Sequence, residues 1–282
     1  MSRGLRRRLA LGLPTLLGLA RRGFFLPHRY AESWPPRVRA NAYPELAERF
    51  QAAEPALLAL LEGVERYGEA LRAIGDAPPP EPRWRQSWFP RLDAAAAYVL
   101  LRERRPPRLV EVGSGHSTRF FRRAARDGGF GLALTAIDPA PRADVAGLPI
   151  TLHRALLQQV GPAPFEGLRA GDAVSIDSSH LLVPGSDVDL FFGRVLPRLP
   201  IGCLLQIHDI FLPDDYPESW DWRGYNEQQV LPPLLESGDW AILWSSRWAS
   251  TRLAEAVARG VAGSLPLMPG ALETSLWLER VG

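Results

Sequence analysis

The spacing of apolar residues in the first third of the chain indicates helices. Residues 44–74 are predicted to form one helix, because their apolar side chains recur near a period of 3.6 residues. These side chains are Leu46, Phe50, Leu57, Leu58, Leu61 and Val64. The segment APPPEP at 77–82 ends this helix, since proline cannot continue it. A second helix is predicted over 92–105, in LDAAAAYVLLRERR.

From Arg108 onward, short apolar runs alternate with helical segments. Strands are predicted at 108–112, 132–137, 149–153, 172–177, 203–208, 239–245 and 273–280. The first five are separated by segments long enough for crossover connections, which favours parallel pairing. The predicted fold class is therefore α/β, with a doubly wound, mostly parallel, seven-stranded Rossmann-like sheet and an N-terminal helical extension. The predicted division is 1–30, a basic and apolar segment; 31–83, a helical extension with a Pro-rich linker; and 84–282, the α/β domain.

Charge and cysteine content narrow the functional classes. The 282 residues contain 33 basic and 31 acidic side chains, and every basic one is an arginine. Because basic residues only slightly outnumber acidic ones over most of the chain, we expect no nucleic-acid partner. A single cysteine, Cys203, excludes an intramolecular disulfide and a cysteine-cluster metal site.

The N-terminus is basic, with a short apolar run. Arginines crowd the first thirty residues, and LALGLPTLLGLA at 9–20 is too short to span a bilayer and contains Pro14. Three interpretations stay open: a signal peptide, a helix lying on an anionic membrane surface, and a basic helix that packs on the domain or is disordered. We expect a cytoplasmic protein, with peripheral contact to the inner membrane through residues 1–30 as an alternative.

The turn after the first strand has an unusual pattern. VEVGSGHST supplies Gly113 and Gly115, but Thr118 replaces the third glycine of a dinucleotide-binding turn, which disfavours a pyrophosphate. Glu111 instead suits a ligand with a cationic centre. Twenty-three residues after Gly115, AIDPAP places Asp138 at the end of the second strand, where an acid can accept hydrogen bonds from both ribose hydroxyls.

These two motifs together resemble the S-adenosylmethionine site of class I methyltransferases. The stretches DAVSIDSSH, LPRLPIGCLLQIHDIFLPDDYP and YNEQQVL are similar to a bacterial subgroup that methylates small molecules. The resemblance implies that residues 84–282 form a methyltransferase domain with S-adenosylmethionine as cofactor. It implies these cofactor-binding residues: Glu111, Gly113, Ser114, Gly115, Ser117, Thr118 and Asp138. The alternative is that the glycines are only turn residues and Asp138 only a cap.

Polar residues also end the fourth and fifth predicted strands. Asp177 and His180 follow the fourth, and His208 and Asp209 follow the fifth, so all four are candidate catalytic residues. In one hypothesis Asp177, His208 and Asp209 bind Mg²⁺ or another divalent cation that lowers the pKa of a hydroxyl. In the other, His180 or His208 is a general base oriented by an aspartate. The metal-free version is preferred, since Mg²⁺ favours oxygen ligands. The structural alternative is that these residues only cap loops.

The segment after the fifth strand, residues 211–231, is predicted to be a substrate lid. Its expected aromatic walls are Tyr216, Trp220, Trp222 and Tyr225, with Asp214 or Asp215 reaching a polar substrate. Asn226 and Glu227 are interpreted as the start of the next helix. Trp84, Trp88 and Phe89 either close the other side of the cleft or pack in the core.

The predicted function is S-adenosylmethionine-dependent O-methylation of a small polar acceptor, such as a sugar or a polyhydroxylated metabolite. N-methylation and a non-catalytic, membrane-associated role are the alternatives. A nicotinamide dehydrogenase is disfavoured by Glu111 and Thr118. The sequence leaves the oligomeric state open.

Overall fold

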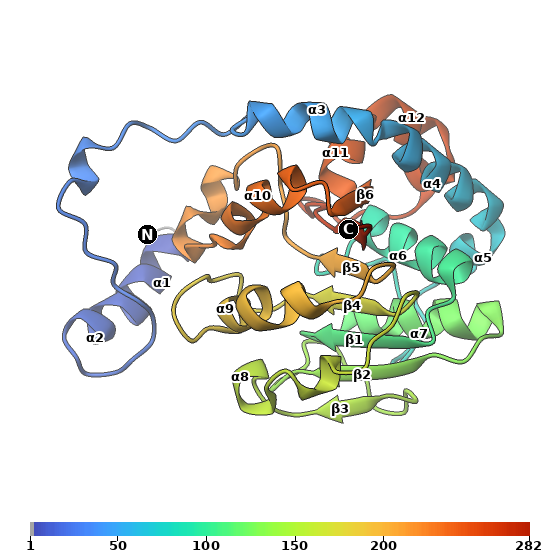
Figure 1. Ribbon diagram of the computed structural model, residues 1–282, viewed down its shortest axis with the longest axis horizontal. Coiled ribbons are helices and arrows are strands. Elements are labelled where there is room, and N and C mark those ends of the chain that lie inside the picture. Colours follow the sequence, from blue (N-terminus) through green and yellow to red (C-terminus); the bar gives the residue numbers. More distant parts are fainter. Residues whose placement is uncertain (1–2) are drawn as a thin grey trace.

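The chain folds around a central sheet flanked by helices (Figure 1). A computed structural model describes residues 3–282, and these contain a seven-stranded sheet. Its strands are β1 (Arg108–Val112), β2 (Ala133–Ile137), β3 (Thr151–His153), β4 (Ala173–Ile176), β5 (Leu204–Ile207), β6 (Trp240–Ser245) and β7 (Leu276–Arg280). Every strand lies inside its predicted range, so the α/β prediction is confirmed.

The strand order is β3-β2-β1-β4-β5-β7-β6. β1 pairs in parallel with β2 and β4, β4 pairs in parallel with β5, and only β7 runs antiparallel to its neighbours within the described sheet. All residues of β4 and β5 are buried, as expected for strands with packed layers on both sides. The chain turns in opposite directions from β1 and β4, and the crevice at this switch point is where ligands bind in such sheets.

The helical extension is interrupted where a single helix was predicted over 44–74. It consists of α3 (Pro44–Ala52), α4 (Glu54–Arg66) and α5 (Gly68–Arg72). Pro55 lacks an N–H group and its ring clashes with a preceding helical turn, so the chain restarts there. α4 packs against β6 and α6 (Arg91–Arg104), the helix predicted at 92–105. The extension therefore shares the core of the sheet, and a domain boundary at residue 83 stays a prediction.

The remaining helices connect the strands. They are α7 (His116–Gly128), α8 (Leu157–Val160), α9 (Asp187–Leu190), α10 (Leu231–Glu236), α11 (Ser246–Thr251), α12 (Ala254–Arg259) and α13 (Val261–Ser264). Short 3₁₀ turns occupy Ala31–Ser33, Ala163–Phe165, Leu196–Arg198, Glu218–Arg223 and Glu227–Val230, and a π turn occupies Phe191–Val195. α7 starts directly after the glycine turn, so its N-terminus points at the switch-point crevice.

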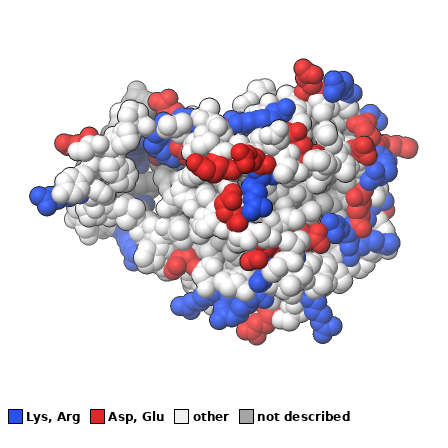
Figure 2. Space-filling view, turned by 45° about the horizontal axis from the view of Figure 1, so that its top comes forward, with Lys and Arg blue, Asp and Glu red and all other residues white. Residues whose placement is uncertain are grey.

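The N-terminal segment begins against the domain, where its first helix contacts the 3₁₀ turn Glu218–Arg223, and its second helix stands away from the body of the molecule (Figure 1). It comprises α1 (Arg3–Arg7), a π turn (Arg8–Gly12) and α2 (Leu13–Leu16), after which the chain returns to the domain without long helices. Met1 and Ser2 of the predicted segment 1–30 lie outside the described residues. No helix within 3–282 has the length and apolar character needed to cross a membrane. On the face shown in Figure 2, arginines and acids are interspersed.

Candidate active site

The turn after β1 brings the ends of two strands into direct contact. Gly113 has φ +80°, and a Cβ there would lie 1.7 Å from the carbonyl oxygen of Asp177. Gly115 has φ +155°, and its Cβ would lie 3.2 Å from the backbone nitrogen of Ala143, in the loop after β2. Glycine is therefore required at position 113, where both the conformation and the close approach exclude a side chain.

Glu111 is bound to the residues that follow this turn. It is fully buried, and its two oxygens accept hydrogen bonds from Ser117 Oγ at 2.5 Å and Thr118 Oγ1 at 2.6 Å. Burial raises the pKa of Glu111 to about 8, although the two hydroxyls act in the opposite direction. Through these hydrogen bonds Glu111 ties the first turn of α7 to the end of β1 and so holds the glycine turn in place. Its predicted role toward a cationic ligand stays a prediction.

Asp138 connects the end of β2 to the same turn. Its Oδ2 accepts hydrogen bonds from the backbone N–H of Ser114 at 2.6 Å and from Ser114 Oγ at 3.3 Å. Its Oδ1 accepts from the N–H of Ala140 at 2.7 Å. Ser114 and Asp138 thus lie side by side at the switch point, where the sequence placed a ribose-binding acid.

Two buried polar atoms near the turn have no hydrogen-bond partner among the described residues: Nδ1 of His116 and Oγ of Ser178. Burial, together with the positive charge of Arg119, lowers the pKa of His116 to about 4, so its ring is neutral. Buried polar groups are normally paired, so these atoms fit a ligand with hydrogen-bonding groups.

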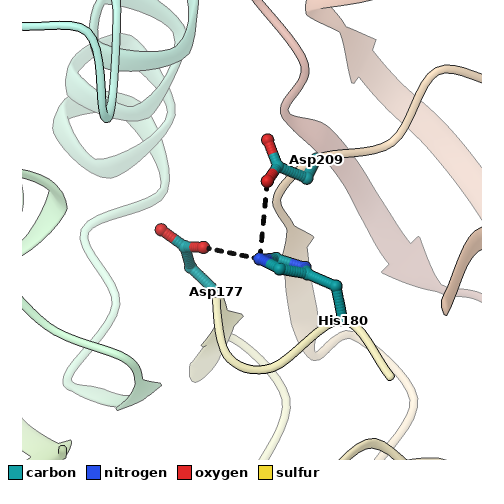
Figure 3. A group of neighbouring side chains, drawn as sticks. All are labelled: Asp177, His180 and Asp209. Carbon is teal, nitrogen blue, oxygen red and sulfur yellow. Dashed lines mark ion pairs between the residues drawn. The ribbon is translucent and has the colours of Figure 1, made fainter. Parts of the chain in front are cut away.

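A cluster of acids and a histidine joins the ends of β4 and β5 (Figure 3). His180 Nε2 lies 3.2 Å from Asp177 Oδ1 and 3.4 Å from Asp209 Oδ2. One potential ligand atom from each residue lies within 4.8 Å of the others, which suits a metal ion. Among the described residues, the histidine of this possible metal site is therefore His180, whereas the sequence predicted His208 as the third ligand.

His180 and Asp209 have a strained backbone. Their φ angles are +59° and +58°, in the left-handed region that non-glycine residues rarely adopt. Such strain is typical of functional sites, because it persists only where the surrounding structure enforces it.

The other nitrogen of His180 contacts Glu227, a residue not predicted to belong to the site. Nδ1 of His180 lies 2.8 Å from Oε2 of Glu227, which is fully buried. Oε1 of Glu227 is buried without a hydrogen-bond partner. In the sequence, the one feature that could have indicated this role of Glu227 is the polar run NEQQ between aromatic and apolar neighbours. The sequence interpretation assigned Asn226 and Glu227 to a helix start, and the 3₁₀ turn Glu227–Val230 does begin there, with Asn226 before it.

His208 lies beside the cluster and is held from its far side. Its Nε2 lies 3.0 Å from Oδ2 of Asp93, and its Nδ1 lies 3.4 Å from Asp209 and 3.6 Å from Asp177. Asp93, in the first turn of α6, is fully buried and also accepts hydrogen bonds from the backbone N–H groups of Thr274 and Ser275. Nothing in the alanine-rich sequence around Asp93 indicated this role.

These contacts set the protonation of both histidines. Burial opposes the charged form of His180, but the hydrogen bonds with Asp177 and Glu227 outweigh it and raise the pKa well above its ordinary value. The pKa of His208 is raised in the same way, against burial, by Asp177 and Asp209. The contacts therefore favour the protonated form of both rings, and carboxylates outnumber cations around them.

A cavity of about 540 Å³ opens above this cluster. Asp177, His208 and Asp209 line its floor. Its aromatic walls are Trp88, Trp220, Trp222 and Tyr225, and its basic walls are Arg7, Arg142 and Arg223. Three of the four predicted lid aromatics therefore line the cavity. Tyr216 does not, because it is buried against Phe211. Trp84 and Phe89 pack in the core, which is one of the two roles that the sequence left open for them.

The two lid acids do not reach into the cavity. Asp214 is 2% exposed and forms ion pairs with Arg247 at 2.8 Å and Arg252 at 2.6 Å. Asp215 is 8% exposed and pairs with Arg37 at 2.6 Å. The prediction that one of them contacts the substrate is wrong, because arginines distant in the sequence neutralise both.

Residues 110–210 match a family model described as a methyltransferase domain, in agreement with the resemblance drawn from the motifs. No curated protein sequence matches the chain. Among solved structures, the chain is similar to the SAH-bound methyltransferase PaMTH1 of Podospora anserina, with 15% identity, TM-score 0.41, and 92% of this chain and 100% of that chain covered. It is also similar to an O-methyltransferase from Bacillus cereus in complex with SAH, with 12% identity, TM-score 0.43, and coverage of 79% and 91%.

Proposed function

We propose that this chain, whose residues 110–210 match a family model described as a methyltransferase domain, transfers the methyl group of S-adenosylmethionine to a hydroxyl of a small polar acceptor. One observation is central to the proposal. The acid and histidine cluster at the ends of β4 and β5 forms the floor of an aromatic-walled cavity, next to the glycine turn that follows β1.

The proposed cofactor site is the crevice between the ends of β1 and β2. The ribose hydroxyls of S-adenosylmethionine would donate to Asp138, and its amino-acid tail would meet the turn at Ser114 and Gly115. Nδ1 of His116 and Oγ of Ser178 offer the unpaired polar atoms that such a ligand needs. The cofactor supplies an electrophilic methyl group. Glu111, Ser117 and Thr118 act indirectly by fixing the turn.

The acceptor would lie in the cavity with its hydroxyl above Asp177 and Asp209. Methyl transfer needs this oxygen in line with the methyl group and the leaving sulfur, and the aromatic walls restrict its orientation. Such an arrangement suits a sugar or a polyhydroxylated metabolite, because aromatic faces pack on the ring and carboxylates accept from hydroxyls.

A divalent cation held by Asp177, His180 and Asp209 is the favoured means of activating the hydroxyl. Both ring nitrogens of His180 and of His208 face carboxylates, which favours protonated rings, and a protonated ring has no lone pair with which to accept a proton. A cation would take the place of the proton at Nε2 of His180, whose Nδ1–H would still donate to Glu227, and it would lower the pKa of the acceptor hydroxyl. Asp177 and Asp209 would hold the cation beside the acceptor oxygen, and the released proton would leave to solvent through the cavity.

The metal-free alternative requires one histidine to be neutral when the acceptor binds. In that case Asp93 or Glu227 would orient the ring, and the opposite nitrogen would accept the proton from the acceptor. A nitrogen acceptor and a non-catalytic role are the further alternatives.

Calorimetric titration with S-adenosylmethionine, with NAD and with Mn²⁺ tests the proposal. We expect S-adenosylmethionine to bind and NAD not to bind, and Asp138→Asn to weaken cofactor binding roughly tenfold through the loss of charge-assisted hydrogen bonds. Asp209→Asn should weaken Mn²⁺ binding while leaving cofactor affinity unchanged. Asp76→Asn, at an exposed ion pair with Arg85, is the matched control and should change neither.

Three outcomes would contradict the proposal. Failure of the folded protein to bind S-adenosylmethionine would leave the non-catalytic role. Cofactor binding without Mn²⁺ binding, together with loss of turnover in His180→Ala, would establish the metal-free mechanism. Product analysis that finds the methyl group on nitrogen would replace the hydroxyl acceptor.

A further inference from the structure

The N-terminal arm, defined as residues 6–26, exposes an unusual number of large apolar side chains. Leu17 is 67% exposed, Leu19 77% and Leu26 71%. Others that are largely exposed are Leu9, Leu11, Leu13, Leu16, Phe24 and Phe25. Large apolar side chains exposed in such number along one segment indicate an interaction site. α1 contacts the 3₁₀ turn Glu218–Arg223, but α2 and the chain that follows it stand off the domain (Figure 1).

The charge of the arm identifies its partner. The first acidic residue of the chain is Glu32, and the arginines ahead of it have no acid in the same segment. Those within the arm are Arg6, Arg7, Arg8, Arg21 and Arg22. Arginines flanking an exposed apolar stretch match the boundary between anionic headgroups and acyl chains. A second copy of the arm would instead bring like charges together.

The arm contacts the wall of the cavity through Arg7. The guanidinium of Arg7 lies 4.8 Å from the ring centre of Trp222, and both residues line the cavity. After the arm, the chain returns along the lid, where Arg39 pairs with Asp221 at 2.8 Å and the N–H of Tyr43 donates to the carbonyl of Pro213 at 3.0 Å. A surface that binds the arm therefore lies close to the cavity mouth.

We infer that the N-terminal arm docks on an anionic bilayer and places the mouth of the cavity at the membrane surface. Leu16, Leu17, Phe24 and Phe25 enter the acyl boundary, and the arginines contact the headgroups. The acceptor of the proposed methyl transfer is then an amphiphile whose polar head enters the cavity from the bilayer. This last step rests on the proposed function, whereas the docking itself does not.

Vesicle sedimentation of the full chain tests the docking. We expect sedimentation with vesicles that contain phosphatidylglycerol, little with phosphatidylcholine alone, and a decrease in high salt. The double variant Leu16→Glu, Leu17→Glu should lower partitioning into the vesicles roughly tenfold or more. It replaces two apolar side chains that would enter the lipid with negative charges that the anionic surface repels. Ile201→Glu is the matched control. Ile201 is 60% exposed and lies before β5, at the end of the sheet opposite to the cavity. It should sediment like the wild type.

A fluorophore at the cavity mouth tests the orientation. The native Cys203 is fully buried, so a cysteine introduced by Ser219→Cys can be labelled selectively. Ser219 lines the cavity. An environment-sensitive label there should shift to the blue with phosphatidylglycerol vesicles, and a label at Ile201→Cys should not.

Sedimentation that is absent, or equal in the wild type and the double variant, would overturn the inference. Concentration-dependent dimerisation abolished by the double variant would assign the arm to a second copy. Calorimetry with S-adenosylmethionine on the same samples separates this result from a failure of the proposed function, because docking and cofactor binding use different residues.

Discussion

Replacement of Asp214 should reveal how strongly one buried carboxylate joins the lid to the domain. Its side chain is 3% exposed and accepts hydrogen bonds from Arg247 and Arg252, each through two contacts of 2.6–2.9 Å. It also accepts from the backbone N–H of Asn41 at 2.9 Å. Asp214→Asn removes the charge but keeps an acceptor oxygen, whereas Asp214→Ala leaves all three donors without this partner.

The size of the effect follows from the pKa of Asp214. Burial would raise it, but the hydrogen bonds from Arg252, Asn41 and Arg247 outweigh burial and lower it from 3.8 to about 2. This shift corresponds to roughly 2–3 kcal/mol of unfolding free energy. The contribution is complete above pH 3.8 and is lost as the pH falls towards 2. We expect Asp214→Asn to cost roughly 2–3 kcal/mol at pH 7, and Asp214→Ala about 3–5 kcal/mol.

Urea unfolding followed by circular dichroism and tryptophan fluorescence measures these losses. Glu255→Gln is the control, because Glu255 and Arg259 form an exposed pair with side chains 92% and 74% accessible. Pairs of this kind contribute little, so its midpoint should not move. A double-mutant cycle with Arg252→Gln should give a coupling of roughly 1–3 kcal/mol. Losses below about 1 kcal/mol in both Asp214 variants would refute the reasoning.

The glycine turn gives two further predictions. The pKa of Glu111 is raised to about 8, so ionisation of this carboxyl makes folding less favourable as the pH rises from 4.5 to 8. Glu111→Gln should flatten this pH dependence and raise the unfolding free energy above pH 8 by up to roughly 5 kcal/mol. Thermal unfolding from pH 5 to 9 checks this, and parallel wild-type and variant curves would contradict it. Gly113→Ala would place a Cβ 1.7 Å from the carbonyl oxygen of Asp177, at a residue with φ +80°. We expect weakened cofactor binding, measured by calorimetry, and a loss of several kcal/mol of stability, measured by urea unfolding. Gly185→Ala is the control for backbone strain alone, because Gly185 also has a positive φ but lies in open space. Equal effects of the two substitutions would show that the contact with Asp177 is unimportant.

Local sequence patterns determined the scaffold of this protein. The periods of the apolar runs located every strand of the described sheet, because burial on a strand or helix depends on spacing along the chain. The turn at Gly113 and Gly115, and the acid Asp138 after β2, were also visible, since tight turns need particular residues. The proximity of Asp177 to His208 and Asp209 followed from the adjacency of β4 and β5. Only the continuous helix over 44–74 was overestimated, where Pro55 outweighed the apolar period.

The partners of the polar side chains were decided by the tertiary structure alone. Asp93 reaches His208 across 115 positions of sequence, and Glu227 reaches His180 across 47. Asp214, which looked available for a substrate, is neutralised by arginines on another helix. A buried charge takes whichever opposite charge the packing brings near, and that choice depends on how helices and loops cross the sheet. The sequence thus specified where the strands end and which chemical groups stand there, while packing decided which of those groups remain free to act.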